Sequence, residues 1–468
     1  MRRLIVLTMS ASLAACAAGP APEIATPAPE LPQDFFYAPD STSEAALDAL
    51  MPVNDAAYRT LSQAALEGAP SLAEALARVD AARAGARRAG SERLPNIGVD
   101  ANVTGTRTNP DQFGSSAQFA QFIDTERVSY GTNLTARWDA DIFGQLRAQE
   151  RAAIARIDAA SASAAAVRLA LLGEIAASVS DWRVIEARSA AITSDVEAAQ
   201  RLAGLARTRE EAGIAPGFDR VRAEAAASAS RSRLAALQSE RVRIVGRLIT
   251  LTGKTGAEVN AALAQAGPAL RQQAAPAALP SQLLANRPDV AAAAAELAAT
   301  DAELAAAARA RFPKLTLSAV LGLLAFNPGD LFDEDSLVGS LAAGVAAPLL
   351  DFGRIEAGID GAAANKRAAF QAYRGAVYQA LGDAEAAYGL IDAADAEAAL
   401  AQDEHEQLQR AASLANDRYR AGLASFLEVL EARRAADASG ERAAAALGRA
   451  QRARIVLWQA LGGDFVAD

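Results

Sequence analysis

The chain repeats itself, and this internal duplication constrains its fold more than any other feature. Alanine-rich sequences match one another by chance, but here proline, phenylalanine and glycine match in one register. The matching pairs lie 218 positions apart before the proposed long helices and 209 apart after their start: Pro70 and Pro288, Pro95 and Pro313, Phe143 and Phe352, Gly213 and Gly422, Gly253 and Gly462. We therefore expect two structural repeats, 41–255 and 288–468, joined by a linker at 256–287.

Long stretches of the chain contain no proline. None occurs between Pro110 and Pro216, and none after Pro348. Proline inside a helix removes a hydrogen bond and clashes with the preceding turn, so these stretches permit very long helices. They are also rich in strong helix formers, and their many alanines let neighbouring helices approach closely, as in the wall of a coiled coil. The sequence thus predicts one long helical hairpin in each repeat.

Each repeat also contains two segments in which apolar and polar residues alternate. They span 96–105, 128–141, 314–322 and 337–349. This period of two predicts β-strands with one apolar face. Each segment has about 10 residues, which is enough to cross a bilayer as a tilted strand. The loops between them are polar or marked by glycine and proline, like the outer turns of a membrane barrel. A small soluble sheet with one wet face would show the same alternation.

If the four strands are in a membrane, they cannot stand alone. Unpaired backbone groups at an open sheet edge are very costly in lipid, and bacterial barrels begin at about eight strands. Several copies must therefore share one barrel. Counting alone allows a dimer with eight strands or a trimer with twelve, and the larger barrel is the one that opens an aqueous pore.

The N-terminus has the pattern of an export signal. Two arginines precede a short apolar core, and small residues stand directly before Cys16, the single cysteine of the chain. We expect residues 1–15 to be a signal peptide, Cys16 to be lipidated, and the proline-rich stretch 16–40 to be an extended tether. Ala17, in place of an aspartate, favours the outer membrane. An ordinary signal peptide with an incidental cysteine is the alternative.

Composition excludes several classes of function. The formal net charge is −10, so the chain is a poor candidate for binding nucleic acid. His405 is the single histidine and lies in a polar helical stretch, where we expect it to be solvated. We expect no catalytic residue, no metal site, no cofactor and no enzyme activity.

Five segments resemble a known family. They are 138–153 (WDADIFGQLRAQERAA), 279–322 with its LPSQLLANRPDV block, 348–358 (PLLDFGRIEAG), 418–434 (RYRAGLASFLEVLEARR) and 457–465 (LWQALGGDF). Together they resemble the TolC-like outer-membrane factor lipoproteins of RND-type tripartite efflux pumps. The likeness implies a mainly α protein with a membrane β-barrel: a homotrimer with a twelve-stranded barrel, a twelve-helix periplasmic α-barrel and a mixed equatorial region that includes 256–287.

The resemblance also implies a function and partners. The chain would passively conduct small molecules, drugs or other organic solutes, from an inner-membrane RND transporter and a periplasmic adaptor to the exterior. The same duct could serve type I secretion or metal efflux. The single histidine and the single methionine of the mature chain, Met51, weakly favour organic solutes. A periplasmic coiled-coil lipoprotein without a pore is the alternative from another class.

The family carries its periplasmic gate beside the hairpin tips. We expect the tips at Gly213 and Gly422, because glycine suits a turn with positive φ, and we expect them at the end away from the membrane. The resemblance places the gate on these residues: Glu428 and Glu431 as an acidic ring, Leu427 as an apolar constriction, and Tyr419, Arg418 and Asp219 as polar links of the closed tip. Such acidic rings favour cations. A solvated helix face is the alternative for the two glutamates.

Overall fold

A computed structural model describes residues 22–39, 47–109, 126–214, 216–268, 274–276 and 286–463. The expected signal peptide and Cys16 lie outside the described residues. The chain forms two compact units. The first combines the N-terminal stretch up to Pro27 with Asp80–Asp158 and Ala295–Gln371, and the second combines Ala28–Val79, Ala159–Ala294 and Ala372–Asp468. Each unit therefore takes segments from both sequence repeats.

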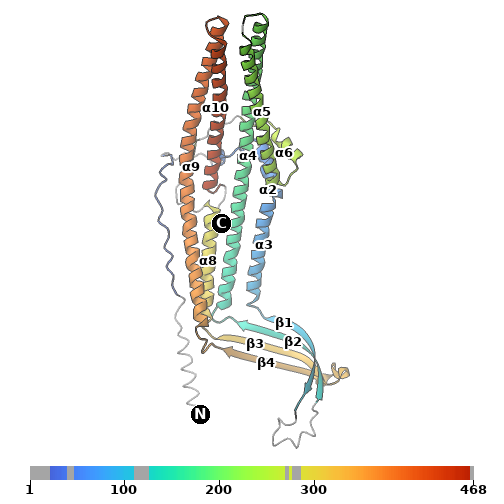
Figure 1. Cartoon of the computed structure of the whole chain (residues 1–468). Coiled ribbons are helices and arrows are strands. Elements are labelled where there is room, and N and C mark those ends of the chain that lie inside the picture. The colour runs from blue at the N-terminus through green and yellow to red at the C-terminus, as the bar shows by residue number, and fades with distance from the viewer. Residues whose placement is uncertain are drawn as a thin grey trace, which may run out of the picture. The chain divides into compact units, whose positions relative to one another are not determined.

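The two halves of the chain contain the same series of elements (Figure 1). The corresponding pairs are α3 (Pro70–Ser91) and α8 (Pro288–Arg309), β1 (Asn96–Arg107) and β3 (Lys314–Ala325), β2 (Glu126–Ala140) and β4 (Leu337–Ala346), α4 (Gln145–Glu211) and α9 (Arg354–Arg420), and α5 (Gly217–Thr252) and α10 (Phe426–Ala460). Both α4 and α9 have 67 residues, and both α3 and α8 have 22. The bounds of α3, β1 and α4 coincide with those of α8, β3 and α9 after the offsets of 218 and 209.

The first unit contains one antiparallel sheet with the strand order β1-β2-β3-β4. Ile97 faces Ala136 in the β1–β2 pair, and the repeat-related residues Leu315 and Val345 face each other in the β3–β4 pair. The strands differ from the expected bounds by one to three residues at most ends. The largest differences, three residues each, are at the C-terminal ends of β3, which extends to Ala325, and of β4, which ends at Ala346 opposite the first residue of β3, Lys314.

The second unit has the main hydrophobic core. It combines α2 (Ala56–Gly68), α6 (Gly256–Leu263) and the short helix η1 (Leu47–Leu50) with parts of α4, α5, α9 and α10. Its fully buried large side chains include Leu61, Ile175, Leu248, Leu263 and Leu457. By length and composition, part of α4 is apolar enough to cross a membrane. Half of that apolar part is buried inside the protein, however, as in the core helix of a soluble domain.

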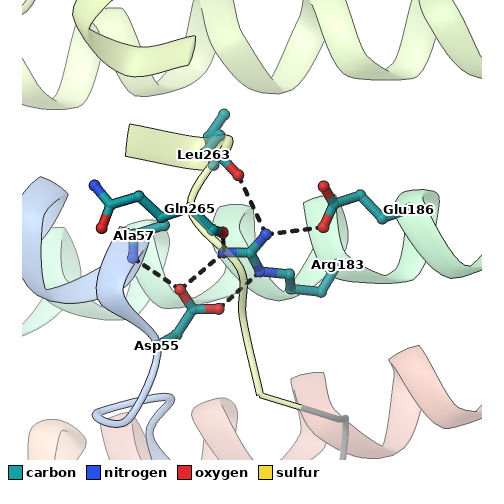
Figure 2. A network of polar contacts seen from close by, with 6 residues as sticks. All are labelled: Asp55, Ala57, Arg183, Glu186, Leu263 and Gln265. Atoms are coloured by element: carbon teal, nitrogen blue, oxygen red, sulfur yellow. Dashed lines mark hydrogen bonds and ion pairs between the residues drawn. The ribbon is translucent and has the colours of Figure 1, made fainter. Parts of the chain in front are cut away.

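A buried arginine joins three elements of this unit (Figure 2). Arg183 of α4 binds Asp55 through two hydrogen bonds of 2.8 and 3.0 Å. It also donates to the carbonyl oxygens of Leu263 and Gln265. Burial raises the pKa of the Asp55 carboxyl, but hydrogen bonds from Arg183 and from the Ala57 N–H outweigh it, so the pKa lies below its usual value. The start of α2 and the end of α6 are thus held to α4 by a paired, fully hydrogen-bonded charge.

A second arginine does the same for the LPSQLLANRPDV block. Arg287 binds Asp289 in the same motif, Asp383 of α9 at 3.1 Å and the Ala460 carbonyl oxygen at the end of α10 at 3.2 Å. The block therefore fixes the start of α8 to the last turn of α10 through one side chain.

Candidate functional site

The sheet of the first unit has one apolar face. Residues paired across antiparallel strands lie on the same face, so the register sorts them. The apolar face carries Ile97, Val99, Ala101 and Val103 of β1, Val128, Tyr130, Thr132, Leu134, Ala136 and Trp138 of β2, Leu315, Leu317, Ala319, Leu321 and Leu323 of β3, and Leu337, Gly339, Leu341, Ala343 and Val345 of β4. Val99 is 76% exposed and Leu341 is 85% exposed. A soluble protein does not leave so large an apolar surface uncovered.

The opposite face is polar and hydrogen-bonded over β1 and β2, whereas over β3 and β4 Val320, Leu324 and Val338 lie among its polar residues. Asn133 donates to Asp100 at 2.9 Å, and Thr316 donates to Asp139 at 2.7 Å, each across a strand pair. β1 and β4 each have one edge with no partner strand in the part of the chain that the structure describes. One continuous apolar face, a more polar opposite face and two open edges are the features of a segment of a membrane barrel.

Aromatic side chains lie where β2 continues into α4. The indole N–H of Trp138 donates to the Arg93 carbonyl oxygen at 2.8 Å. Phe143 stacks on Phe312 with ring centroids 4.8 Å apart. Trp138 suits the boundary between lipid and water, because its side chain is apolar at one end and polar at the other, and aromatic residues in general are enriched there.

Both hairpins of the second unit turn at glycine. Gly213 has φ of 74° and Gly422 has φ of 75°. The N–H of Ile214 donates to the Arg209 carbonyl oxygen at 2.9 Å, and that of Leu423 to the Arg418 carbonyl oxygen at 2.8 Å. This pattern closes the last turn of α4 and α9 in the same way, and it requires a residue that tolerates a left-handed backbone.

Tyr419 connects the two tips. Its hydroxyl accepts a hydrogen bond of 2.8 Å from Arg209 of α4, and its ring packs edge-on against Phe426. The same ring belongs to a small apolar cluster formed by Ala206, Ala223, Phe426, Val429 and Leu430. Tyr419 is therefore a link between the hairpins, and Arg209 is its partner. Arg418 instead donates to the Leu423 carbonyl oxygen of its own turn at 3.3 Å.

The expected acidic residues lie in three different environments. Glu428 forms a capping box: its N–H donates to the Ser425 hydroxyl at 3.2 Å, and its carboxylate accepts from the Ser425 N–H at 3.4 Å. Glu431 is exposed, and Leu427 beside it is partly exposed. Asp219 occupies the position of Glu428 in the first hairpin. Among the described residues it has no side-chain hydrogen bond or ion pair, since Pro216 precedes α5 in place of a capping serine.

A buried acidic pair between the hairpins was not expected. Asp195 of α4 and Asp437 of α10 share Arg433, at 3.6 and 3.2 Å from its nitrogens. Burial, followed by the hydrogen bond and charge of Asp195, raises the pKa of Asp437 to about 7. Both acids line a cleft of about 630 Å³ between α4, α9 and α10, beside His405. His405 is partly buried and lies 3.1 Å from the buried Ser439 hydroxyl.

Some of these contacts had a sequence signal and others had none. The serine at 425 followed by glutamate three positions later is the signature of a capping box. Arg209 is the repeat counterpart of Arg418 but takes the contact to Tyr419. Nothing local marks Asp195 and Asp437 as neighbours, because they come from different repeats. Among the described residues, no group of three or more histidine, cysteine or acidic side chains could hold a metal ion.

Comparison with known proteins places the chain in a family. The profile of the outer membrane efflux protein family (OEP) matches residues 61–254 and 279–463, once in each half of the chain. The chain belongs to this family, whose members are the TolC-like outer-membrane factors.

Individual relatives agree with this assignment. The chain is 32% identical over 411 residues to the pyoverdine export outer membrane protein OpmQ of Pseudomonas aeruginosa, covering 87% of this chain and 85% of that protein. It is 28% identical to the toluene efflux pump outer membrane protein TtgI of Pseudomonas putida, over 88% and 86% of the two chains. The solved outer-membrane channel OprN superposes with a TM-score of 0.85 at 25% identity, over 95% of this chain and 98% of OprN. The protein is an outer-membrane component of an efflux system.

Proposed function

We propose that three copies of this chain form one export duct, with a twelve-stranded barrel in the outer membrane and a twelve-helix α-barrel in the periplasm. The observation that carries the proposal is the four-stranded sheet, with its exposed apolar face, its polar face and its two open edges. In lipid both edges must be paired, and copies of the same sheet are the nearest source of strands. The polar faces then line an aqueous lumen.

The duct passes small organic solutes received from an inner-membrane RND transporter through a periplasmic adaptor. The support is the family and the cargo for which two relatives are named, pyoverdine for OpmQ and toluene for TtgI. The hairpin tips are the docking end for the adaptor. The N-terminal segment completes the assignment: residues 1–15 are removed, Cys16 is lipidated and 16–40 is the tether. The segment 256–287 belongs to an equatorial region.

The tips form the periplasmic gate. Tyr419 and Arg209 hold the two hairpins together. Glu428 and Glu431 are the exposed acids of the gate, and Asp219 is half-buried. Three copies of each carboxylate around a narrow opening favour cations over anions. Glu428 contributes less to this selectivity, because its carboxylate is held by Ser425.

Single-channel recording of the purified protein in planar bilayers tests the duct and the gate together. We expect discrete, cation-selective steps, with selectivity reduced by Glu431→Gln and retained in Glu296→Gln, an exposed glutamate of α8 used as the matched control. Tyr419→Phe combined with Arg209→Ser removes both partners of the bond between the hairpins, and it should open the tip and raise conductance. If the assembled protein is silent in both wild type and this tip variant, the pore assignment is wrong. Selectivity unchanged by Glu431→Gln would place the selective ring elsewhere.

A further inference from the structure

One strand pairing inside the chain is equivalent, by the internal repeat, to the pairing that would join two neighbouring chains. The pairing of β2 with β3 joins the first repeat to the second. A next copy added at the free edge would bring its β1 beside β4, which again joins repeat to repeat. The repeats agree to the residue in this region: moving the β1–β2 register by the offsets of 218 and 209 reproduces the β3–β4 register, as with Ile97–Ala136 and Leu315–Val345.

The same shift predicts the missing register. Within the chain, Ala136 faces Ala319 and Leu134 faces Leu321. Adding 209 to the β2 residue and subtracting 218 from the β3 residue places Val345 opposite Ala101 of the next copy. Ala343 is likewise placed opposite Val103. The residues matched in this way lie on the apolar face of both strands, so pairing β4 with β1 of the next copy keeps the lipid-facing side chains on one side.

Beside the strands, two apolar residues whose repeat counterparts stack on each other are themselves exposed. Phe143 stacks on Phe312 within the chain, and their repeat counterparts are Phe352 and Leu94. Phe312 is partly buried, whereas Phe352 is 91% exposed and Leu94 is 65% exposed. Phe352 also has φ of 55°, a left-handed conformation that is unfavourable for an aromatic residue, and no other described non-glycine residue has a positive φ.

Two more apolar residues are exposed along the same two edges. Leu349, next to β4, is 93% exposed, and Ile97, on β1, is 67% exposed. Their counterparts within the chain are Ala140 and Leu315, which face each other across the β2–β3 pair and are both partly buried. The uncovered apolar residues thus lie at the positions that the repeat-related contact would cover.

We propose that neighbouring copies join through a β4–β1 seam in which Val345 lies opposite Ala101 and Ala343 opposite Val103, with Phe352 packed on Leu94 of the next copy. This inference rests on the proposed assembly but goes further, because it fixes the register and the anchoring side chain. Each free edge is paired by a second copy of this chain, because the strand equivalent to the partner in the β2–β3 pair belongs to this same sequence.

Disulfide cross-linking with four cysteine pairs tests the register. Val345→Cys with Ala101→Cys and Ala343→Cys with Val103→Cys are in register. Val345→Cys with Val103→Cys and Ala343→Cys with Ala101→Cys are shifted by two residues and use the same four substitutions. Directly opposite residues lie within the Cα separation that a disulfide needs, whereas diagonal ones are about 7–8 Å apart, so in-register pairs should cross-link at least about fivefold more under mild oxidation.

The controls separate this inference from the proposed assembly. Each single-cysteine variant reports any bond to Cys16, and native mass spectrometry in detergent reports the number of copies. Preferential cross-linking of the shifted pairs would give another register and overturn the proposal. So would trimers in which no pair cross-links, although the assembly would then stand. A monomer in detergent extracts would overturn both the seam and the assembly.

Discussion

The two hairpin tips have the same backbone and opposite chemistry. At the first tip, Arg220 of α5 binds Glu210 of α4 at 2.6 Å and Glu224 at 3.0 Å. The counterparts of Glu210 and Arg220 in the second hairpin are Tyr419 and Val429, which pack in an apolar cluster. One tip is closed by partly exposed ion pairs and the other by buried side chains. Duplication thus preserved the turn and allowed the contacts to diverge.

The difference extends along the hairpins. In the second hairpin, Glu404 of α9 pairs with Arg442 of α10. Their counterparts in the first hairpin are Asp195 and Arg233, but Arg233 instead binds Glu441 of the second hairpin at 2.8 Å. Asp195 therefore faces Asp437 and shares its arginine. At this position the second hairpin pairs its own charges, whereas Arg233 of the first hairpin pairs with the neighbouring hairpin.

The strongest test of this contrast removes the apolar contact. Phe426→Ala should cost about 3 kcal/mol locally, because a buried aromatic side chain leaves a cavity between Tyr419 and Leu430. Hydrogen exchange followed by mass spectrometry should show loss of protection in both tips, since Ala206 and Ala223 of the first hairpin belong to the same cluster. Protection lost only in the second hairpin would mean that the cluster does not join the tips.

The acidic pair provides a pH test of the link between hairpins. An acid whose pKa is raised on folding binds its proton more tightly in the native state, so its contribution to stability is lost as pH rises. Between the usual aspartate pKa of 3.8 and about 7, the wild type should lose about 1.4 kcal/mol for each pH unit at most.

Asp437→Asn should remove most of this dependence, and its thermal midpoint at pH 8 should exceed that of the wild type. The comparison is made between melting curves at pH 5 and pH 8. Asp417→Asn, a substitution of another aspartate near the second tip, is the control and should leave the pH dependence in place. Parallel pH profiles for Asp437→Asn and the wild type would show that the pair is not the source.

Sequence reasoning predicted the elements better than the contacts. The absence of proline in α4 and α9, and a glycine at each turn, were enough to predict both hairpins, because backbone conformation is decided locally. The alternation of apolar and polar residues predicted which residues share a face of the sheet. The observed strand ends differ from the predicted ones because a strand ends where its pairing with a neighbour ends. The contacts of the candidate site were harder to predict from the sequence. Glu428 was assigned to the gate by family likeness, yet its carboxylate lies in a capping box that Ser425 signals locally.

Contacts between repeats had no signal of this kind. Tyr419 was expected to take part in polar links, but its partner is Arg209, and Arg418 stays within its own turn. Both arginines occupy equivalent positions in their repeats, so the choice depends on how the hairpins pack. The same holds for Asp195 and Asp437, which are far apart in the sequence and become neighbours only when α4 lies beside α10.

The capping box gives a smaller and more local test. Ser425→Ala removes the hydroxyl that accepts from the Glu428 N–H and should cost about 1 kcal/mol at the start of α10. Because Pro216 precedes α5 and gives it no side-chain cap, the first hairpin has no equivalent hydrogen bond to lose. Hydrogen exchange of residues 426–430 should therefore speed up while that of 217–221 is unchanged. Ser425→Asp, which can also cap, should restore protection.

The smallest expected effect concerns the partly exposed ion pairs of the first tip. Arg220→Ala removes both bridges, but these side chains are 31–37% exposed, so solvent screens their charges and the pairs contribute little to stability. We expect a slight increase in exchange at 217–224 at low salt, and no difference from the wild type at high salt. Tyr419→Phe is the matched change at the other tip. Because Tyr419 is only 9% exposed, the effect of losing its hydrogen bond from Arg209 should persist at high salt. If both variants responded to salt alike, the two tips would be equally electrostatic and the contrast between them would fail. An effect of Arg220→Ala that survives high salt would instead mean that its guanidinium acts by packing against the neighbouring helix.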